Sequence, residues 1–248
     1  MPRTVKEKEY AVKRNEILDM AEQLIYRKGY EQMTIQDILD GLEISKGAFY
    51  HYFDSKQALL EALVERMLEL AEQAILPIVQ DPNLPALEKM QRYFATANRW
   101  KSERKAFLIP FIQVWYADDN AIVREKFNTM GSEHVGPWLA QIIRQGVQEE
   151  TMNTPYPEQM GALVLSILWK LGDTFARLLI NYEGGSESPQ RAQDMVVAYS
   201  DALERVLGAP KGSLQLMDDE SVKEWFVAWD EQANRQSVTE PLKTTQNP

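Results

Sequence analysis

Residues 34–60, TIQDILDGLEISKGAFYHYFDSKQALL, decide the fold expected for this 248-residue chain. The first residue, Thr34, stands three positions before Asp37, which is the spacing of a capping box at the start of a helix. We expect Gly41 to end that helix after two turns. Ser45 is placed to cap a second short helix. Two short capped helices joined by a tight turn have the dimensions of a helix-turn-helix, whose second helix enters the major groove of DNA.

The second short helix, which we expect to run from Ser45 through Phe53, combines a buried face with a polar surface. Phe49 and Phe53 are four positions apart, so they share one face, and we assign that face to the core. Consecutive residues on a helix point about 100° apart, so their neighbours cannot all be buried with them. Hydroxyl, imidazole and ammonium groups donate hydrogen bonds to phosphate oxygens, and small residues let the backbone approach the bases. The residues expected to face outward, wholly or in part, are Lys46, Gly47, Ala48, Tyr50, His51 and Tyr52.

Lys56 begins the next helix, immediately after a second N-cap residue, Ser55. The free backbone N–H groups of a helix N-terminus already favour an anion, and the lysine adds a positive charge. A phosphate is therefore expected to bind there. Against this interpretation, aromatic residues in a short helix more often pack than bind nucleic acid, and Phe49 and Phe53 fit that simpler explanation.

The motif resembles the N-terminal domain of the TetR family of bacterial repressors. The resemblance extends over about the first 65 residues and includes Gly29-Tyr30, residues 34–38 (TIQDI) and residues 45–56 (SKGAFYHYFDSK). It implies phosphate contacts for one group of residues and positions near base edges for another. The first group is Thr34, Tyr50, Tyr52 and Lys56, with Ser45 as a cap that also touches phosphate; the second is Lys46, Gly47, Ala48 and His51. An arm before the first helix is also implied, with Arg3, Lys6, Lys8, Lys13 and Arg14 as candidate contacts.

The charge of the chain is unusual for a nucleic-acid-binding protein. The net charge is −10, whereas affinity for DNA comes largely from cations. Residues 1–56, however, hold nine Lys or Arg against ten Asp or Glu, so most of the excess acid lies beyond them. We infer that, for DNA binding, the face on which the cations lie matters more than the net charge of the whole chain.

The sequence contains none of the motifs that we associate with common enzyme classes. There is no cysteine, no glycine-rich phosphate loop, no HExxH and no strained nucleophile turn. His134 has no second metal ligand at a useful spacing. We therefore expect a protein that is not an enzyme and that uses no cofactor or metal.

Helical periodicity dominates the chain, and no segment alternates as a strand would, so we predict an all-α fold. Three prolines, Pro77, Pro82 and Pro85, indicate a boundary region between modules. We predict a helix-turn-helix domain over residues 1–56, a helical ligand-binding and dimerisation domain over 57–236, and a disordered tail over 237–248. The long helix after Ser55 joins the first two. Helices are expected at residues 9–28, 56–75, 85–101, 102–116, 119–150 (kinked near Pro137), 157–181, 189–207 and 218–233.

The larger domain is rich in aromatic and thioether side chains, which are suited to lining an apolar cavity. An ordinary packed core is the simpler explanation for each of them taken singly. The candidate ligand-binding residues are Phe107, Phe111, Trp115, Phe127, Met130, His134, Trp138, Trp169 and Asp173. Asp173 and Arg177 are also spaced for an ion pair within one helix.

Two apolar seams in the late helices suggest a symmetric four-helix interface, as the family resemblance also implies. They are Val164, Leu168, Leu171, Phe175 and Leu178 on the helix 157–181, and Ala192, Met195 or Val196, Tyr199, Ala202 or Leu203, and Val206 on the helix 189–207. We expect a homodimer through these helices, which would bind a palindromic operator.

The family resemblance, together with linkage between two binding sites, implies a cytoplasmic repressor in which double-stranded DNA and a small, mainly apolar or aromatic effector each weaken the binding of the other. No membrane association is expected, because the apolar segment 160–180 carries three charged residues and the N-terminus lacks an apolar signal core. An activator with the same DNA-binding motif remains an alternative. So does a helical protein-interaction module that does not bind DNA.

Overall fold

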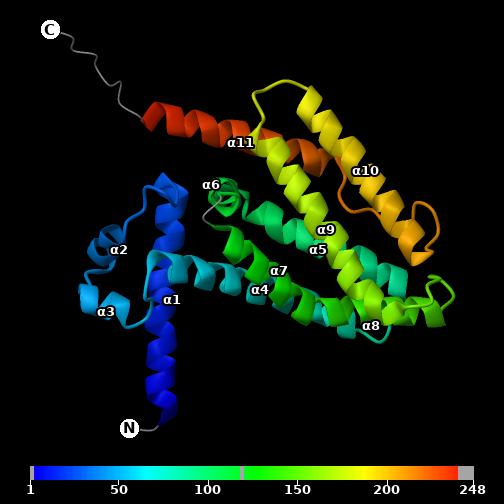
Figure 1. Cartoon of the computed structure of the whole chain (residues 1–248), viewed down its shortest axis with the longest axis horizontal. Helices are drawn as coiled ribbons and strands as arrows, with labels where there is room; N and C mark the ends of the chain where they lie inside the picture. Colours follow the sequence, from blue (N-terminus) through cyan, green and yellow to red (C-terminus); the bar gives the residue numbers. More distant parts are fainter. Residues whose placement is uncertain (1–2, 118–119, 240–248) are drawn as a thin grey trace.

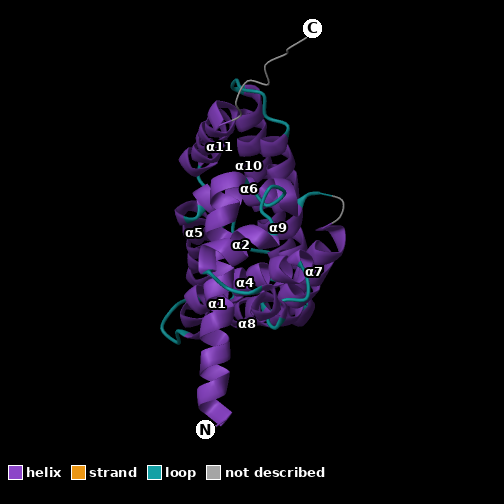
Figure 2. Cartoon of the chain, turned by 90° about the vertical axis from the view of Figure 1, so that its left-hand side faces the viewer, coloured by secondary structure: helices purple, strands orange, loops and turns teal. Residues whose placement is uncertain are grey.

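A computed structural model describes residues 3–117 and 120–239. These residues form eleven α-helices and no strand, which confirms the all-α prediction (Figures 1 and 2). The helices are α1 (Arg3–Lys28), α2 (Ile35–Leu42), α3 (Lys46–Tyr50), α4 (Lys56–Gln80), α5 (Ala86–Glu103), α6 (Lys105–Trp115), α7 (Ala121–His134), α8 (Gly136–Gln148), α9 (Pro157–Ile180), α10 (Glu187–Leu207) and α11 (Asp219–Thr239).

The first helix is longer than its apolar pattern predicts. It begins at Arg3 rather than near residue 9, and its N-terminal half projects away from the rest of the molecule (Figures 1 and 2). The segment expected to be an arm is therefore helical. Within it, Lys13 pairs with Glu16 at 2.7 Å, and the Arg14 guanidinium lies 5.3 Å from the centre of the Phe53 ring. As predicted, Gly29 follows the helix with a positive φ of 78°.

The α2 helix confirms the predicted start and corrects the predicted end. Thr34 and Asp37 form the complete capping box. Gly41 does not end the helix; Glu43 does so, in a left-handed conformation with φ 52°. A Cβ atom at Gly41 would lie 2.8 Å from the Met20 sulfur, so this glycine permits α2 to approach α1 closely.

The α4 helix continues through the first proline of the expected boundary. Pro77 lies inside the last turns of α4, which ends at Gln80. A proline there removes one intrahelical hydrogen bond. The buried side chains of Ile75 and Val79 hold this end of the helix against the core, which explains why the helix does not end earlier.

Residues 119–150 form two helices rather than one kinked helix. The chain breaks at Val135, and Pro137 lies in the first turn of α8, where its missing N–H needs no partner. The α8 and α9 helices then pack very closely. A Cβ atom at Gly161 would lie 2.0 Å from the Gly136 carbonyl oxygen, so glycine is required at this contact.

The last helix, α11, docks on the body as its aromatic stripe predicts. Val222, Trp225, Phe226 and Trp229 are all buried. The helix continues to Thr239, three residues into the segment expected to be disordered, and the rest of that segment lies outside the described residues.

The apolar seams assigned to a dimer interface require a correction. In α9, Val164 is fully buried in the single subunit, and Leu168, Leu171 and Phe175 line an internal cavity. In α10, Ala192, Val196 and Leu203 are also buried, whereas Val206 and the alternative Ala202 are exposed and Met195 and Tyr199 are half-buried. The sequence pattern identified apolar faces correctly but did not reveal that helices of the same chain cover most of the α9 seam and part of the α10 seam.

One hydrophobic core runs through the whole described chain, from the first helices to α11. Within these residues, none of the helices combines the length and the apolar character needed to cross a membrane.

Candidate functional site

The short helix α3 presents polar side chains over a buried base. Ser45 caps it by accepting a hydrogen bond from the Ala48 N–H at 3.1 Å, and Phe49 and Phe53 are buried as predicted. The helix is shorter than expected and ends at Tyr50. The residues left exposed on and beside α3 are Ser45, Lys46, Gly47, Tyr50 and His51, whereas Ala48 and Tyr52 are half-buried.

A residue of α1 that the sequence analysis did not select completes this surface. The Tyr10 ring lies 4.7 Å from the Tyr52 ring and 5.7 Å from the His51 ring, measured between centroids. Tyr10 is itself 40% exposed. It lies outside the apolar face of α1, so periodicity alone gave no reason to choose it. The Lys46 ammonium lies 5.9 Å from the centre of the Tyr50 ring, which places a cation and a phenol side by side.

Lys56 occupies the N-terminus of α4, where Ser55 accepts a hydrogen bond from the Ala58 N–H. Its ammonium lies 4.2 Å from the centre of the Tyr30 ring and donates to the Glu31 carbonyl oxygen at 3.3 Å. Partial burial lowers the pKa of Lys56. The structure thus holds this cation in place beside the turn that follows α1.

Thr34 is exposed, but both of its donors are used within the capping box. Its hydroxyl donates to the Asp37 carboxylate at 2.6 Å, and its backbone N–H donates to the same oxygen at 2.7 Å. Lys28 reaches that oxygen too, at 2.6 Å. In this geometry Thr34 shapes the site and has no free donor for a phosphate.

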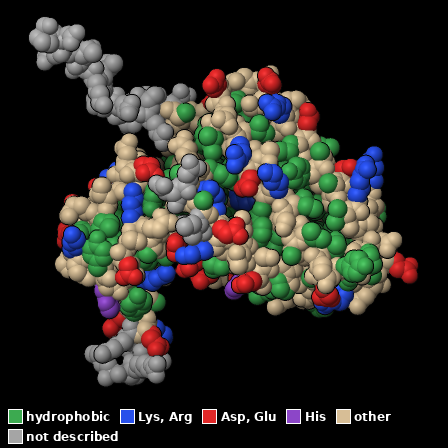
Figure 3. Space-filling model, viewed as in Figure 1, with side chains coloured by type: hydrophobic (Ala, Val, Ile, Leu, Met, Phe, Trp, Pro, Cys, Tyr) green, Lys and Arg blue, Asp and Glu red, His purple; other side chains and the backbone are tan. Residues whose placement is uncertain are grey.

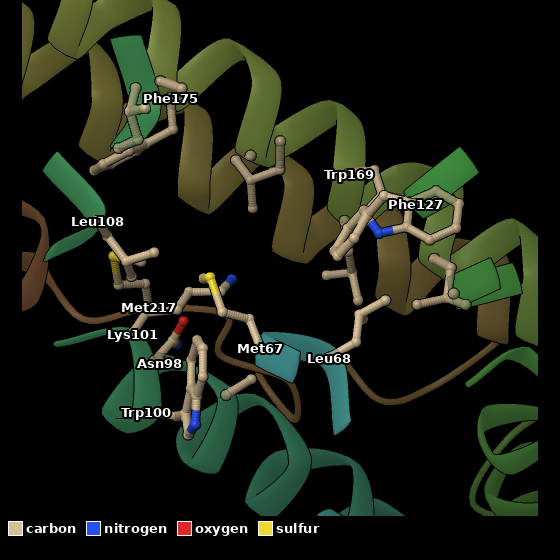
Figure 4. A pocket seen from close by; sticks show the side chains of 18 of the residues that line it. Met67, Leu68, Asn98, Trp100, Lys101, Leu108, Phe127, Trp169, Phe175 and Met217 are labelled. Atoms are coloured by element: carbon tan, nitrogen blue, oxygen red, sulfur yellow. The ribbon is translucent and has the colours of Figure 1, made fainter. Parts of the chain in front are cut away.

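A second candidate site is a cavity of about 410 Å³ enclosed mainly by α4, α5, α6, α7 and α9. Four of the predicted ligand-binding residues line it: Phe111, Trp115, Phe127 and Trp169. Figure 4 shows Trp169 and Phe127 together at one end of the cavity. The aromatic side chains of the larger domain therefore do surround a hollow space.

Five of the predicted ligand-binding residues do not line the cavity, which corrects their assignment. Met130 and Trp138 are half-buried outside its wall. Phe107 is buried and stacks on Phe111 at 5.5 Å. His134 is exposed, with its Nδ1 atom 3.8 Å from Glu72. In the described part of the chain, Asp173 accepts a 2.6 Å hydrogen bond from the cavity-lining Tyr116 and forms no ion pair with Arg177.

Several residues that line the cavity were not predicted. Most of them lie on helices for which no contact with a ligand was expected. They are Met67, Leu68 and Glu72 of α4, Asn98 and Lys101 of α5, and Met217 before α11. The apolar residues among them continue the inward faces of their helices, which was the available signal. Nothing in the pattern indicates that Lys101 turns inward.

Comparison with known proteins defines this architecture further. Residues 17–63, from within α1 to within α4, match the family model described as bacterial regulatory proteins, tetR family. The HTH-type transcriptional repressor DhaR of Mycobacterium sp. (strain GP1) is 28% identical over 82 residues, which are 33% of this chain and 41% of that protein. The HTH-type transcriptional repressor NemR of Escherichia coli (strain K12) is 36% identical over 67 residues, or 27% and 34% of the two chains. The matched segments span less than half the length of these curated relatives.

Solved structures share the fold over most of the chain. Reduced NemR of E. coli covers 80% of this chain and 99% of its own, with a TM-score of 0.53 and 19% identity. A TetR-family transcriptional regulator from Pectobacterium atrosepticum covers 85% of this chain and 100% of its own, with a TM-score of 0.60 and 17% identity. The fold and the paired short helices define an all-α helix-turn-helix protein. Its N-terminal segment, residues 17–63, is similar to the corresponding segment of the tetR family of bacterial regulatory proteins.

Proposed function

We propose that this protein is a DNA-binding transcriptional repressor, not an enzyme, that a small apolar or aromatic molecule releases from a palindromic operator. The observation that carries this proposal is the surface of α3, where Lys46, Tyr50 and His51 are exposed above a buried base of Phe49 and Phe53. Cationic and hydroxyl donors on a short helix of this kind suit phosphates and base edges. Relatives that match this part of the chain are named as repressors.

The acidic net charge does not oppose this proposal, because the charges are mixed over the surface. Figure 3 shows Lys and Arg side chains scattered among Asp and Glu on the face that it displays. Several carboxylates are paired within the chain; Arg66, for example, pairs with Asp19 and Glu22, each at 2.6 Å. Among the described residues, neither Lys46 nor Lys56 forms an ion pair with a carboxylate, although Glu31 lies close enough to Lys56 to act on its pKa.

We assign DNA binding to residues 1–56 and ligand binding and dimerisation to residues 57–236. The α4 helix connects these functions, since its first residue is Lys56 and its later residues Met67, Leu68 and Glu72 line the cavity. Arg66 ties α4 to α1 between the two ends. A ligand that shifts α4 would change the separation of the two recognition helices in a dimer, and by linkage DNA would weaken ligand binding by the same factor.

We infer that two copies pair through the outward faces of α9 and α10, which share Val206 with the seams predicted from the sequence. Large apolar side chains remain exposed on these helices of the single subunit: Leu163 and Ile180 on α9, and Val197 and Val206 on α10. Val197 is 64% exposed, which is typical of a residue that a partner covers. We place the repressor in the cytoplasm, where its DNA lies.

The proposal is tested by capturing genomic fragments on the purified full chain and footprinting those that bind. The expected result is protection of two inverted half-sites about 34–36 Å apart, the separation that a symmetric dimer of recognition helices requires. Sedimentation of the same preparation should give a dimer. The alternative function, a protein-interaction module, predicts no duplex binding even at low salt.

A further inference from the structure

The cavity wall is apolar except at a few positions. Most of its side chains are aliphatic, aromatic or thioether groups, and the polar lining groups belong to Glu72, Tyr93, Asn98, Lys101 and Tyr116, together with the Trp100 indole. A few polar groups in a mainly apolar wall are what fixes the orientation of a bound ligand. Each charged group in the wall therefore needs an explanation.

Lys101 is the charged group without an evident partner. It lies in the last turn of α5, and Figure 4 shows its side chain reaching into the cavity between Met217 and Met67. Lys101 is exposed and lines the cavity, and the protein around it lowers the pKa of its ammonium by desolvation. In the described part of the chain, no carboxylate forms an ion pair with Lys101.

Three of the other polar groups of the wall are engaged elsewhere. The Asn98 amide donates to the Leu216 carbonyl oxygen, and the Tyr116 hydroxyl donates to Asp173. Glu72 is 3.8 Å from His134 of α7. Lys101 is thus the cation that remains available to a molecule inside the cavity, and Glu72 would repel an anion from its own part of the wall.

We propose that the effector carries one carboxylate on an apolar body and that Lys101 pairs with this carboxylate inside the cavity. This inference rests on the proposed ligand-binding function of the cavity. The apolar body extends toward Phe127 and Trp169, which lie at the opposite end from Lys101 in Figure 4. Lys101 is exposed, so its ammonium is free to meet a ligand, and an ion pair formed beside the apolar wall is stronger than one in open solvent.

The test compares carboxylates with neutral amides of the same shape, by titration calorimetry on the full chain. Naphthylacetate with naphthylacetamide represents an aromatic body, and decanoate with decanamide represents an alkyl body. We expect wild-type protein to bind at least one carboxylate about tenfold or more tighter than its amide, as a charge-assisted hydrogen bond allows. The pair that shows the larger preference identifies the class of the apolar body.

Two variants of Lys101 separate charge from shape. Lys101→Met keeps the length of the side chain and should abolish the preference for the carboxylate, whereas Lys101→Arg should retain part of it. Because Lys101 is exposed and has no ion-pair partner among the described residues, Lys101→Met should change the melting temperature little. The matched control is Lys126→Met, which replaces an exposed lysine of α7 that pairs with Glu61 outside the cavity; it should leave the preference unchanged.

Equal binding of both members of each pair to wild-type protein would overturn the inference but leave the cavity as a ligand site. Failure of all four probes to bind would overturn it as well. An unchanged preference in Lys101→Met would show that another group binds the carboxylate. Carboxylate binding that depends on Lys101 but does not affect operator binding would support the inference and contradict the proposed function instead.

Discussion

The Lys56 ammonium lies 4.2 Å from the centre of the Tyr30 ring, and the Tyr30 hydroxyl donates a 3.3 Å hydrogen bond to the Lys56 carbonyl oxygen. These two contacts join residues that are 26 positions apart in the sequence. Burial raises the pKa of Tyr30 to about 12, so its hydroxyl stays protonated and able to donate at neutral pH. The turn after α1 therefore fixes the N-terminus of α4 beside α3.

Substitution of Tyr30 should separate stability from DNA binding. Tyr30→Phe loses the hydroxyl but keeps the ring, so we expect a loss of about 1 kcal/mol in the free energy of unfolding and little change in DNA affinity. Tyr30→Leu also removes the cation–π contact and should weaken DNA binding by about two- to fivefold. Denaturant titration and fluorescence anisotropy measure the two effects. Wild-type DNA affinity in the leucine variant would show that Lys56 needs no such support.

The Asp37 carboxylate makes the N-terminal domain sensitive to acid. The ion pair with Lys28 and the hydrogen bonds from Thr34 hold the pKa of Asp37 well below its usual value of about 4. A lowered pKa in the folded state means that this stabilisation is complete above about pH 4 and is lost as the pH falls below it. Asp37→Asn should therefore melt below the wild type at neutral pH, and the two melting temperatures should converge in acid. A constant difference at every pH would contradict the assignment.

Two glycines of α9 should respond oppositely to alanine. At Gly161 the new Cβ atom would meet the Gly136 carbonyl oxygen at 2.0 Å, and since this is backbone, α8 and α9 must separate. We expect Gly161→Ala to lower the free energy of unfolding by about 3 kcal/mol or more. At Gly172 nothing lies within 4 Å, so Gly172→Ala should raise it by about 0.5–1 kcal/mol through helix propensity. Calorimetric melting of both variants checks this, and a neutral Gly161→Ala would contradict the close helix contact.

Arg66 should be the strongest polar link between α1 and α4. Its side chain is only 17% exposed and reaches Asp19 and Glu22 at 2.6 Å each. Arg66→Met keeps much of the packing but loses both charge-assisted bonds, so we expect a loss of about 1–2 kcal/mol. The control is Arg92→Met, which removes an exposed pair with Glu88 within α5 and should change stability by about 0.5 kcal/mol or less. Equal effects of the two substitutions would show that Arg66 provides no special link.

The helix-turn-helix could be predicted from sequence because its determinants are local. The capping box at Thr34, the cap at Ser45 and the buried pair Phe49 and Phe53 depend on spacings of three and four residues. The errors arose where tertiary packing overrides a local signal. Gly41 serves a close helix contact rather than a helix end, and Pro77 is tolerated inside α4 because the neighbouring side chains of Ile75 and Val79 are buried.

The cavity could be predicted only in part. Periodicity shows which side chains point inward, so the aromatic residues Phe111, Trp115 and Trp169 were found. It does not show where inward-facing side chains fail to meet, so Met67 and Lys101 were missed and Phe107 was wrongly included. The assignment of the α9 and α10 seams to a dimer interface failed for a related reason. A sequence pattern cannot distinguish an apolar face that the same chain covers from one that a second copy covers.

The central claim is that α3 binds DNA through its exposed side chains. Its most direct test is fluorescence anisotropy of a duplex from the region upstream of the protein's own gene, with wild type, Lys46→Ala and the exposed control Lys126→Ala, at several salt concentrations. We predict that Lys46→Ala weakens binding about tenfold or more and flattens the salt dependence, while Lys126→Ala behaves as the wild type. Wild-type affinity and salt dependence in Lys46→Ala would contradict the claim.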